Sequence, residues 1–223
     1  MGRRSKARNR TRVFIVQDKS GSMGSRREAT ISGFNEYVDE LEDKKDGEIL
    51  LSLIQFDTRI ENKFLNRRIE DIDALTEEDF IPGGMTALLD GVGQAIRTAE
   101  LSSGKDDKVL VVIMTDGGEN SSREYRHDAI LKAISEKRKD GWEFLFMGAG
   151  EEAWGAGQQL FSSVIPMHTH SINYSGLDAH DHKHGYAALA NSTLRSAGGQ
   201  SAAFDSGVKS RLENKALAEV GKK

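Results

Sequence analysis

Residues 13–22 read VFIVQDKSGS, and this stretch decides the fold. Its first half is a short, nearly continuous apolar run rich in β-branched residues, as expected for a parallel strand that helices cover on both faces. Its second half turns at once to an acid, two hydroxyls and a glycine. In open α/β sheets ligands bind outside the carboxyl ends of the strands, so this junction is a place to look for function.

Further apolar runs predict the rest of the sheet. Buried strands are expected at Ile49–Phe56, at Val109–Thr115 and at Trp142–Met147, with a weaker one at Ser163–Met167. Arg59–Ile69 is more polar and its apolar residues alternate, so it is expected to form an edge strand antiparallel to its neighbour.

Amphipathic segments fill the gaps between these strands. Apolar residues recur at helical spacing over Ile31–Leu41, Leu88–Ala99 and Ala129–Ile134, and Ser121–Glu124 has the Ser-x-x-Glu form of a capping box before the third of these helices. A later helix is expected from Leu177–Ala197. Strands that alternate with helices predict an α/β fold, doubly wound, with a mostly parallel sheet, one antiparallel edge strand and helices on both faces.

Length and composition fit a single α/β domain. The chain has 223 residues, of which 37% are hydrophobic and 30% charged, and this length can bury a substantial core. We expect a basic N-terminal arm at 1–11, the folded domain at 12–198 and a C-terminal tail at 199–223, with a weak helix at Lys209–Val220. There is no run of about 18 apolar residues and no apolar stretch of a secretory signal, so no membrane association is expected.

The absence of cysteine narrows the chemistry. It excludes disulfides, zinc sites built from thiolates, and cysteine nucleophiles. It also fits a reducing compartment, so a cytoplasmic location is expected.

Charge is unevenly distributed along the chain. Residues 1–12 carry six bases and no acid, which leaves 25 bases against 35 acids, a net charge of −10, on the rest. The basic residues are Arg3, Arg4, Lys6, Arg8, Arg10 and Arg12. Such an arm is often only a solvated tail, but it could make weak contact with nucleic acid, and that affinity would fall steeply with salt.

Three segments at predicted strand ends and helix starts carry oxygen-bearing side chains. They are Asp18-Lys19-Ser20-Gly21-Ser22, Gly83-Gly84-Met85-Thr86 and Thr115-Asp116-Gly117-Gly118. The candidate ligands taken from them are Asp18, Ser20, Ser22, Thr86 and Asp116, a set of two carboxylates and three hydroxyls with neither sulfur nor imidazole. A hard oxygen set with only two negative charges suits Mg²⁺, with Mn²⁺ and Ca²⁺ as alternatives.

These three segments resemble the metal-ion-dependent adhesion site of von Willebrand factor type A domains, in the order and at the spacing typical of that family. The resemblance covers about residues 11–150 and extends to Gly33-Phe34-Asn35, Gln55-Phe56-Asp57 and Gly141-Trp142-Glu143-Phe144, which look like the stand-alone bacterial and bacteriophage members. It implies that Ser20, Ser22 and Thr86 are hydroxyl ligands, and that Asp18 and Asp116 bind directly or through water. Lys19 is expected to point away from the ion.

The resemblance also implies a function. Family members that bind proteins often complete the metal shell with a carboxylate of the partner, so we expect a metal-ion-dependent protein-binding module of the adhesion or scaffold type. The alternatives are a regulatory or assembly subunit that partners an ATPase or another enzyme, and, lower, a Mg²⁺-dependent phosphohydrolase. The sequence lacks a nucleophile elbow, a phosphate-binding loop and an H-E-x-x-H motif, so no enzymatic activity is expected.

Two other patterns compete for a role. Gly148-Ala149-Gly150-Glu151-Glu152-Ala153 has the form of a dinucleotide fingerprint, but its two acids would repel a pyrophosphate. Five of the six histidines lie within His168–His184, where His180, Asp181 and His184 could form a second metal site. An exposed hydrophilic loop explains that spacing equally well.

Overall fold

The fold is a six-stranded sheet between two layers of helices. The computed structural model describes residues 10–174 and 179–220, and the sheet order is β3-β2-β1-β4-β5-β6. Five strands run parallel and only β3 is antiparallel, so the predicted doubly wound sheet with one antiparallel edge strand is confirmed. The strands are β1 (Arg10–Asp18), β2 (Glu48–Phe56), β3 (Ile60–Arg68), β4 (Lys108–Thr115), β5 (Glu143–Ala149) and β6 (Ser171–Tyr174).

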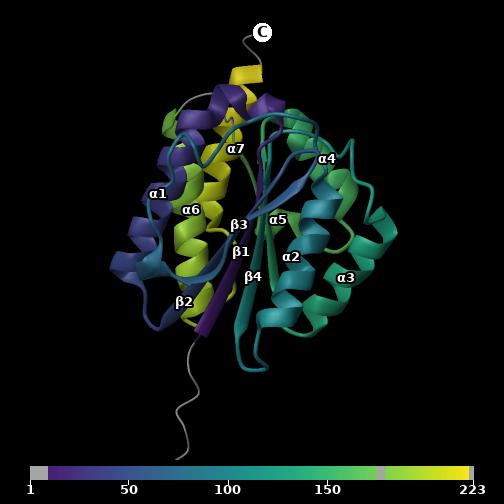
Figure 1. The fold of residues 1–223 in the computed structure, drawn as a ribbon. Coiled ribbons are helices and arrows are strands. Elements are labelled where there is room, and N and C mark those ends of the chain that lie inside the picture. The colour runs from purple at the N-terminus through teal and green to yellow at the C-terminus, as the bar shows by residue number, and fades with distance from the viewer. Residues whose placement is uncertain (1–9, 175–178, 221–223) are drawn as a thin grey trace, which may run out of the picture.

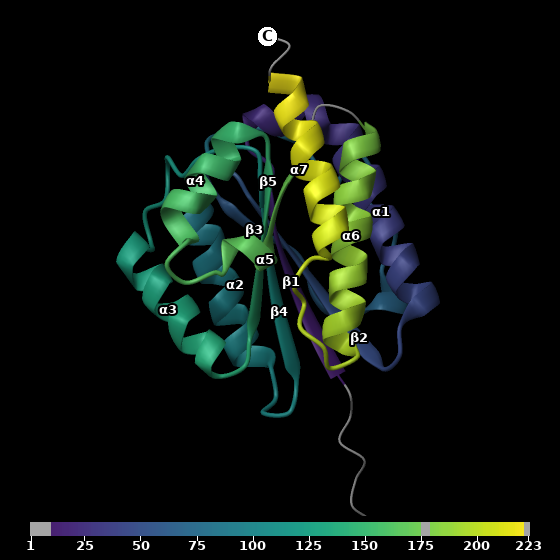
Figure 2. The same ribbon diagram turned by 180° about the vertical axis from the view of Figure 1, so that it is seen from behind.

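Helices cover both faces of the sheet. Figures 1 and 2 show α1, α6 and α7 on one face and α2, α3 and α4 on the other. The helices are α1 (Arg27–Lys44), α2 (Leu88–Ser102), α3 (His127–Lys139), α4 (Glu151–Phe161), α5 (Met167–His170), α6 (Ala179–Ala197) and α7 (Ser206–Val220), with the short 3₁₀ helices η1 (Gly21–Arg26) and η2 (Ile69–Asp71).

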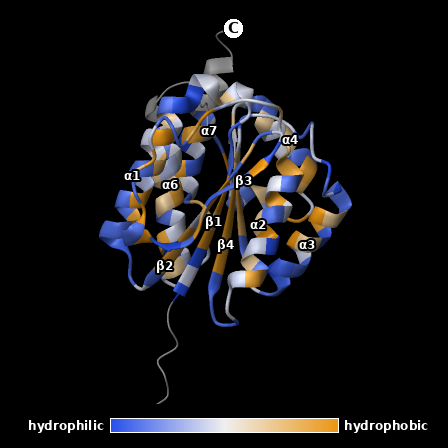
Figure 3. Ribbon diagram, in the orientation of Figure 1, coloured by the Kyte–Doolittle hydropathy of each residue, from blue (hydrophilic) through white to orange (hydrophobic). Residues whose placement is uncertain are grey.

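The core follows from this layering. The strands β1, β2 and β4 are hydrophobic along most of their length, whereas the outward sides of the helices are mainly hydrophilic (Figure 3). Side chains alternate between the two faces, so Val13 and Ile15 pack toward α1 and α6 while Phe14 and Val16 pack toward α2. Both faces are buried, which explains why these strands read as continuous apolar runs.

One predicted strand is wrong. Ser163–Met167 does not join the sheet; the sixth strand is Ser171–Tyr174. The amides of Val164 and Ile165 both donate to the carbonyl of Phe161 and continue the turn that ends α4. Val164 and Ile165 do pack in the core, but against the helices of the α2 face, and so their apolar character was mistaken for strand.

The predicted capping box is also wrong. Helix α3 begins at His127 rather than next to Ser121–Glu124. The amides of Ser121 and Ser122 donate to the carboxylate of Glu119, and the amide of Glu124 donates to Asp90. These residues therefore form a loop that is fixed to its neighbours instead of a helix start.

The two ends of the chain add to the domain. Residues 1–9 of the predicted arm lie outside the described residues, but Arg10 and Arg12 belong to β1 and pair with Glu48 and Asp107. After Gly198, the chain contributes Ala202, Phe204 and Leu212 to the core, and α7 contacts β6. Across 10–174 and 179–220, no helix combines the length and apolarity needed to cross a bilayer.

Candidate metal site at the carboxyl edge of the sheet

Two neighbouring parallel strands bring the acidic residues together. β1 and β4 are paired with Gln17 opposite Met114, so both strands end at the same edge of the sheet. Asp18 is the last residue of β1, and Asp116 follows the last residue of β4. The sheet register alone thus places two residues that are 98 positions apart on adjoining strand ends.

Asp18 is held in place from both sides. Its side chain is fully buried, with an exposed fraction of 0% for the residue. Oδ1 accepts a hydrogen bond from the backbone amide of Ser20 at 2.7 Å, and Oδ2 accepts one from Thr115 Oγ1 at 2.6 Å. The first bond folds the loop back over the strand end, and the second ties β1 to β4.

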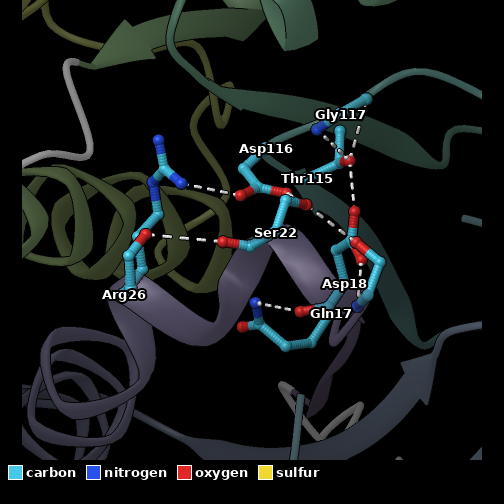
Figure 4. Close-up of polar contacts among 9 residues, drawn as sticks. Gln17, Asp18, Ser22, Arg26, Thr115, Asp116 and Gly117 are labelled. Atoms are coloured by element: carbon cyan, nitrogen blue, oxygen red, sulfur yellow. Dashed lines mark hydrogen bonds and ion pairs between the residues drawn. The ribbon is translucent and has the colours of Figure 1, made fainter. Parts of the chain in front are cut away.

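The two serines connect one carboxylate to the other. Ser20 Oγ and Ser22 Oγ lie 3.1 Å apart, and Ser22 Oγ donates to Asp116 Oδ1 at 2.6 Å. Figure 4 shows Ser22 and Asp116 facing each other, with Asp18 and Thr115 beside them. Ser20 is buried whereas Ser22 is exposed, so solvent reaches the network at Ser22 but not at Ser20.

The remaining oxygen of Asp116 is bound by a cation of the protein itself. Arg26 Nη1 donates to Asp116 Oδ2 at 2.8 Å (Figure 4). Arg26 is the last residue of η1. The side chains of Arg26 and Asp116 are 14% and 1% exposed, respectively. Sequence reasoning did not find this arginine, because nothing in the pattern around it marks it as a site residue.

The segment that carries Thr86 is attached to the first segment and to the loop that follows Asp116. The Gly21 amide donates to the Gly84 carbonyl, and the Thr86 amide donates to Asn120 Oδ1 at 2.8 Å. Thr86 is only 4% exposed, and a Cβ placed on Gly117 would lie 3.8 Å from its Oγ1. The hydroxyl of Thr86 therefore faces the residue that follows Asp116.

Gly84 explains the shape of this segment. Its φ of +69° lies in the left-handed region, and a Cβ there would approach Thr58 Oγ1 to 2.7 Å. Its neighbour Met85 donates its amide to the same hydroxyl at 2.9 Å. Glycine thus lets the loop pass close to Thr58 before Thr86 turns inward.

Burial raises the pKa of both carboxyls. Burial is the largest influence on the pKa of Asp18, and hydrogen bonds from Thr115 and Ser20 only partly offset it. For Asp116, burial again raises the pKa, against hydrogen bonding by Ser22 and the charge of Arg26. Two carboxylates in a poorly solvated site with one neighbouring cation are under-compensated, and a further positive charge there would be stabilised.

The donor set fits a hard divalent cation. Asp18, Ser20, Ser22 and Asp116 form one hydrogen-bonded network, and the Thr86 hydroxyl lies by Gly117. All five offer oxygen, which Mg²⁺, Mn²⁺ and Ca²⁺ prefer. Lys19 turns to the edge strand, where its Nζ lies 2.5 Å from Glu61 Oε2, and so it is not part of the site.

The histidine cluster is spread over several elements. His168 and His170 belong to α5, where His170 Nδ1 lies 2.8 Å from Thr169 Oγ1, whereas His184 belongs to α6. The side chains of His180, Asp181 and His182 lie outside the described residues. Within the described part of the chain, no group of three or more His, Cys, Asp or Glu side chains could hold a metal ion.

Comparison with solved structures reveals the fold. No protein-family model matches the sequence, and no curated protein matches it. A solved von Willebrand factor type A protein from Catenulispora acidiphila superposes with a TM-score of 0.60 at 16% identity, over 85% of this chain and 43% of that one. This chain has the von Willebrand factor type A (vWA) fold.

Two further structures share the vWA fold. Proximal thread matrix protein 1 from the mussel byssus was solved with zinc in its metal-ion-dependent adhesion site (MIDAS) motif. It superposes with a TM-score of 0.55 at 15% identity, over 84% of this chain and 48% of that one. The pilus adhesin SpaC from Lactobacillus rhamnosus GG gives a TM-score of 0.65 at 13% identity, over 83% of this chain and 30% of that one. The chain spans less than half the length of each of these three proteins.

Proposed function

We propose that this chain is a protein-binding module of the adhesion or scaffold type, which holds its partner through a divalent cation. The cation is bound by Asp18, Ser20, Ser22, Thr86 and Asp116, and we propose Mg²⁺, with Mn²⁺ and Ca²⁺ as alternatives. The network that joins two buried carboxylates through the Ser20 and Ser22 hydroxyls, open to solvent at Ser22, carries this proposal.

The chemistry of the site favours binding over catalysis. A bound dication would supply an open coordination position that attracts a carboxylate of the partner. The residues of the chain hold and orient: Thr115 fixes Asp18, and Ser22 faces solvent beside Asp116. Three of the five ligands are hydroxyls, and the two carboxylates are engaged by Thr115, Ser22 and Arg26, so we propose no nucleophile, no general base and no enzymatic activity.

The structural neighbours support the same class of function. One is a pilus adhesin and another is a thread matrix protein whose MIDAS motif holds zinc. Such proteins differ greatly from this chain in sequence, so their partners are not transferred to it. A cytoplasmic location and a weak contact of the basic arm with nucleic acid stay predictions from the sequence.

Calorimetric titration with MgCl₂ tests the metal site. The wild type should bind one cation, and Asp18→Asn and Ser22→Ala should each weaken binding by at least about tenfold. Asp57→Asn is the matched control, because Asp57 is also a buried acid that follows a strand, but its Oδ1 accepts from the Arg59 amide instead of joining the network. Equal effects in all three variants would contradict the assignment.

Peptide display tests the mode of protein binding. The immobilised chain would be panned with a random peptide library in Mg²⁺, and bound peptides would be released with EDTA. The released sequences should be enriched in Asp and Glu, and Asp116→Ala should fail to select them. Peptides that bind equally well in EDTA, or to Asp116→Ala, would show that binding does not pass through the cation.

A further inference from the structure

Arg26 contacts a carboxylate that the proposed cation would also need. Both oxygens of Asp116 are engaged, Oδ1 by the Ser22 hydroxyl at 2.6 Å and Oδ2 by the Arg26 guanidinium at 2.8 Å. Ser22 can stay when a metal ion binds, because its oxygen is itself a suitable ligand. A guanidinium has no acceptor atom and carries a positive charge, so it cannot share the carboxylate with a dication without cost.

The charge balance of the site depends on the same residue. Among the ion pairs formed by the described residues, Asp18 takes part in none, and Arg26 provides the one cation that contacts Asp116. The two buried carboxylates therefore rely on Arg26 for compensation when no metal ion is bound. A bound dication would take over that task.

The hydrogen bonding of the Arg26 guanidinium is incomplete. Arg26 Nε is buried and has no hydrogen-bond partner among residues 10–174 and 179–220. A buried donor without a partner is unfavourable, so among the described residues the contact with Asp116 is the polar contact that holds the guanidinium here. The Arg26 side chain is 14% exposed, so part of it already reaches solvent.

We propose that Arg26 is a tethered cation that substitutes for the metal ion at Asp116 and thereby lowers the affinity of the site for free divalent cations. This inference rests on the proposed metal site. It assigns Arg26 a role in setting how tightly the cation is held, and it requires the guanidinium to leave Asp116 Oδ2 when the cation binds there. Without Arg26 the site would bind metal more tightly but would be less stable when empty.

Calorimetry on charge variants tests the competition. Arg26→Gln should bind Mg²⁺ about tenfold or more tightly than the wild type, whereas Arg26→Lys, which keeps the charge, should stay close to the wild type. Arg27→Gln is the matched control for the loss of one nearby positive charge, because Arg27 donates to the carbonyls of Phe80 and Glu77 and does not touch the site. It should change the affinity no more than about threefold.

Melting curves provide a second readout. In EDTA, Arg26→Gln should melt below the wild type, and adding Mg²⁺ should raise its melting temperature more than that of the wild type. In the wild type itself, the Nε–H resonance of Arg26 should shift on Mg²⁺ addition while that of Arg27 stays in place. This last measurement needs no variant and holds even where Arg26→Gln fails to fold.

The outcomes separate this inference from the proposed function. Suppose that the wild type binds Mg²⁺ and that Asp116→Ala abolishes binding. If Arg26→Gln then binds Mg²⁺ with the same affinity as the wild type, or with a lower one, Arg26 merely positions Asp116 and the inference is wrong. An Arg26 resonance that ignores Mg²⁺ would overturn it in the same way. If neither folded wild type nor folded Arg26→Gln binds any cation, the proposed function is wrong as well.

Discussion

Aspartates lie at both ends of the parallel strands, at the amino edge where the strands begin and at the carboxyl edge where they end, and the chain compensates them differently. At the amino edge, the Asp107 side chain is 9% exposed and pairs with Arg12 at 2.5 Å and with Arg10 at 3.9 Å. At the carboxyl edge, Asp18 forms no ion pair among the described residues, and Asp116 forms one. Burial acts on the pKa of all three carboxyls, but Arg12, the Gly104 amide and Arg10 bring the pKa of Asp107 below its ordinary value, whereas those of Asp18 and Asp116 are raised.

This difference separates structure from function. The amino edge is complete within the protein, so its charges serve the fold. At the carboxyl edge, two buried carboxylates share the single cation Arg26 among the described residues, and under the proposed function a bound dication would supply the remaining positive charge.

Breaking the amino edge should have the largest effect. Arg12→Met removes the bond to Asp107 and the one to Asn66 Oδ1, and it leaves Asp107 with the Gly104 amide and the more distant Arg10 as its partners among the described residues. We expect a loss of about 3 kcal/mol in the free energy of unfolding, measured with urea, and unchanged Mg²⁺ affinity.

An exposed ion pair provides the control for that loss. Arg126 and Asp128 are 88% and 78% exposed, so Arg126→Met should cost no more than about 0.5 kcal/mol. If the Arg12 and Arg126 variants were equally stable, the amino edge would not be the structural charge centre that the geometry indicates.

The corresponding change at the carboxyl edge should act on binding instead of stability. Asp18→Asn removes an unpaired buried charge, so in EDTA its free energy of unfolding should stay within about 1 kcal/mol of the wild type. Its Mg²⁺ affinity should fall by about 10- to 100-fold. A variant that unfolds as easily as Arg12→Met, with or without metal, would remove the distinction between the two edges.

Acid should act on the two edges with opposite sign. The lowered pKa of Asp107 gives a stabilisation that is present above the ordinary value of 3.8 and is lost as the pH falls through the lowered pKa. The raised pKa values of Asp18 and Asp116 give a contribution to the metal-free protein that is present below 3.8 and is lost as the pH rises through the raised pKa values.

Mg²⁺ titrations and urea unfolding at several pH values check this. Because protons and metal compete for the two carboxyls whose pKa is raised, Mg²⁺ affinity should fall as the pH is lowered from about 7 towards the ordinary aspartate value of 3.8. In EDTA, the free energy of unfolding of Asp18→Asn should decrease less with rising pH than that of the wild type. For Asp107→Asn, the free energy of unfolding should decrease less with falling pH than that of the wild type. A metal affinity that is constant over this range would contradict the raised pKa values.

The smallest effects are expected from surface apolar residues near each edge. Met85, which is 52% exposed, precedes Thr86 at the candidate site, and Leu101, which is 81% exposed, lies near the end of α2 at the amino edge. Replacing either by serine should change the free energy of unfolding by less than about 0.5 kcal/mol. Only Met85→Ser should weaken binding of the EDTA-sensitive peptides, and an equal loss in Leu101→Ser would show that the contact is not local to the metal site.

Much of the fold could be predicted, because strands that are buried on both faces consist of nearly continuous apolar residues. β1, β2, β4 and β5 are apolar on both faces, so their positions were right to within a few residues. β6 was missed because Ser171–Tyr174 alternates polar and apolar residues over only four positions, whereas the neighbouring Val164 and Ile165 are more apolar but end a helix. Apolar character identifies burial, and only hydrogen bonding decides which element is buried.

The candidate site was predictable only in part. Asp18, Ser20 and Ser22 share one short segment, so their pattern could be seen at once. The residues that hold them could not be found in this way: Thr115 bonds to Asp18 across 97 positions and Arg26 bonds to Asp116 across 90. Such contacts depend on how the strands are ordered, and no local periodicity encodes that order.

The loop that follows Asp116 has a practical consequence for handling the protein. Asn120 brackets Thr86 by accepting from its amide and donating to its carbonyl, and Glu119 accepts from the Leu89 amide. Two loops joined in this way have matched lengths, so neither should tolerate inserted residues. The exposed turn at Lys105 and Asp106 lies at the opposite edge of the sheet, and a tag inserted there would let the protein be anchored to a surface with Ser22 facing away from it.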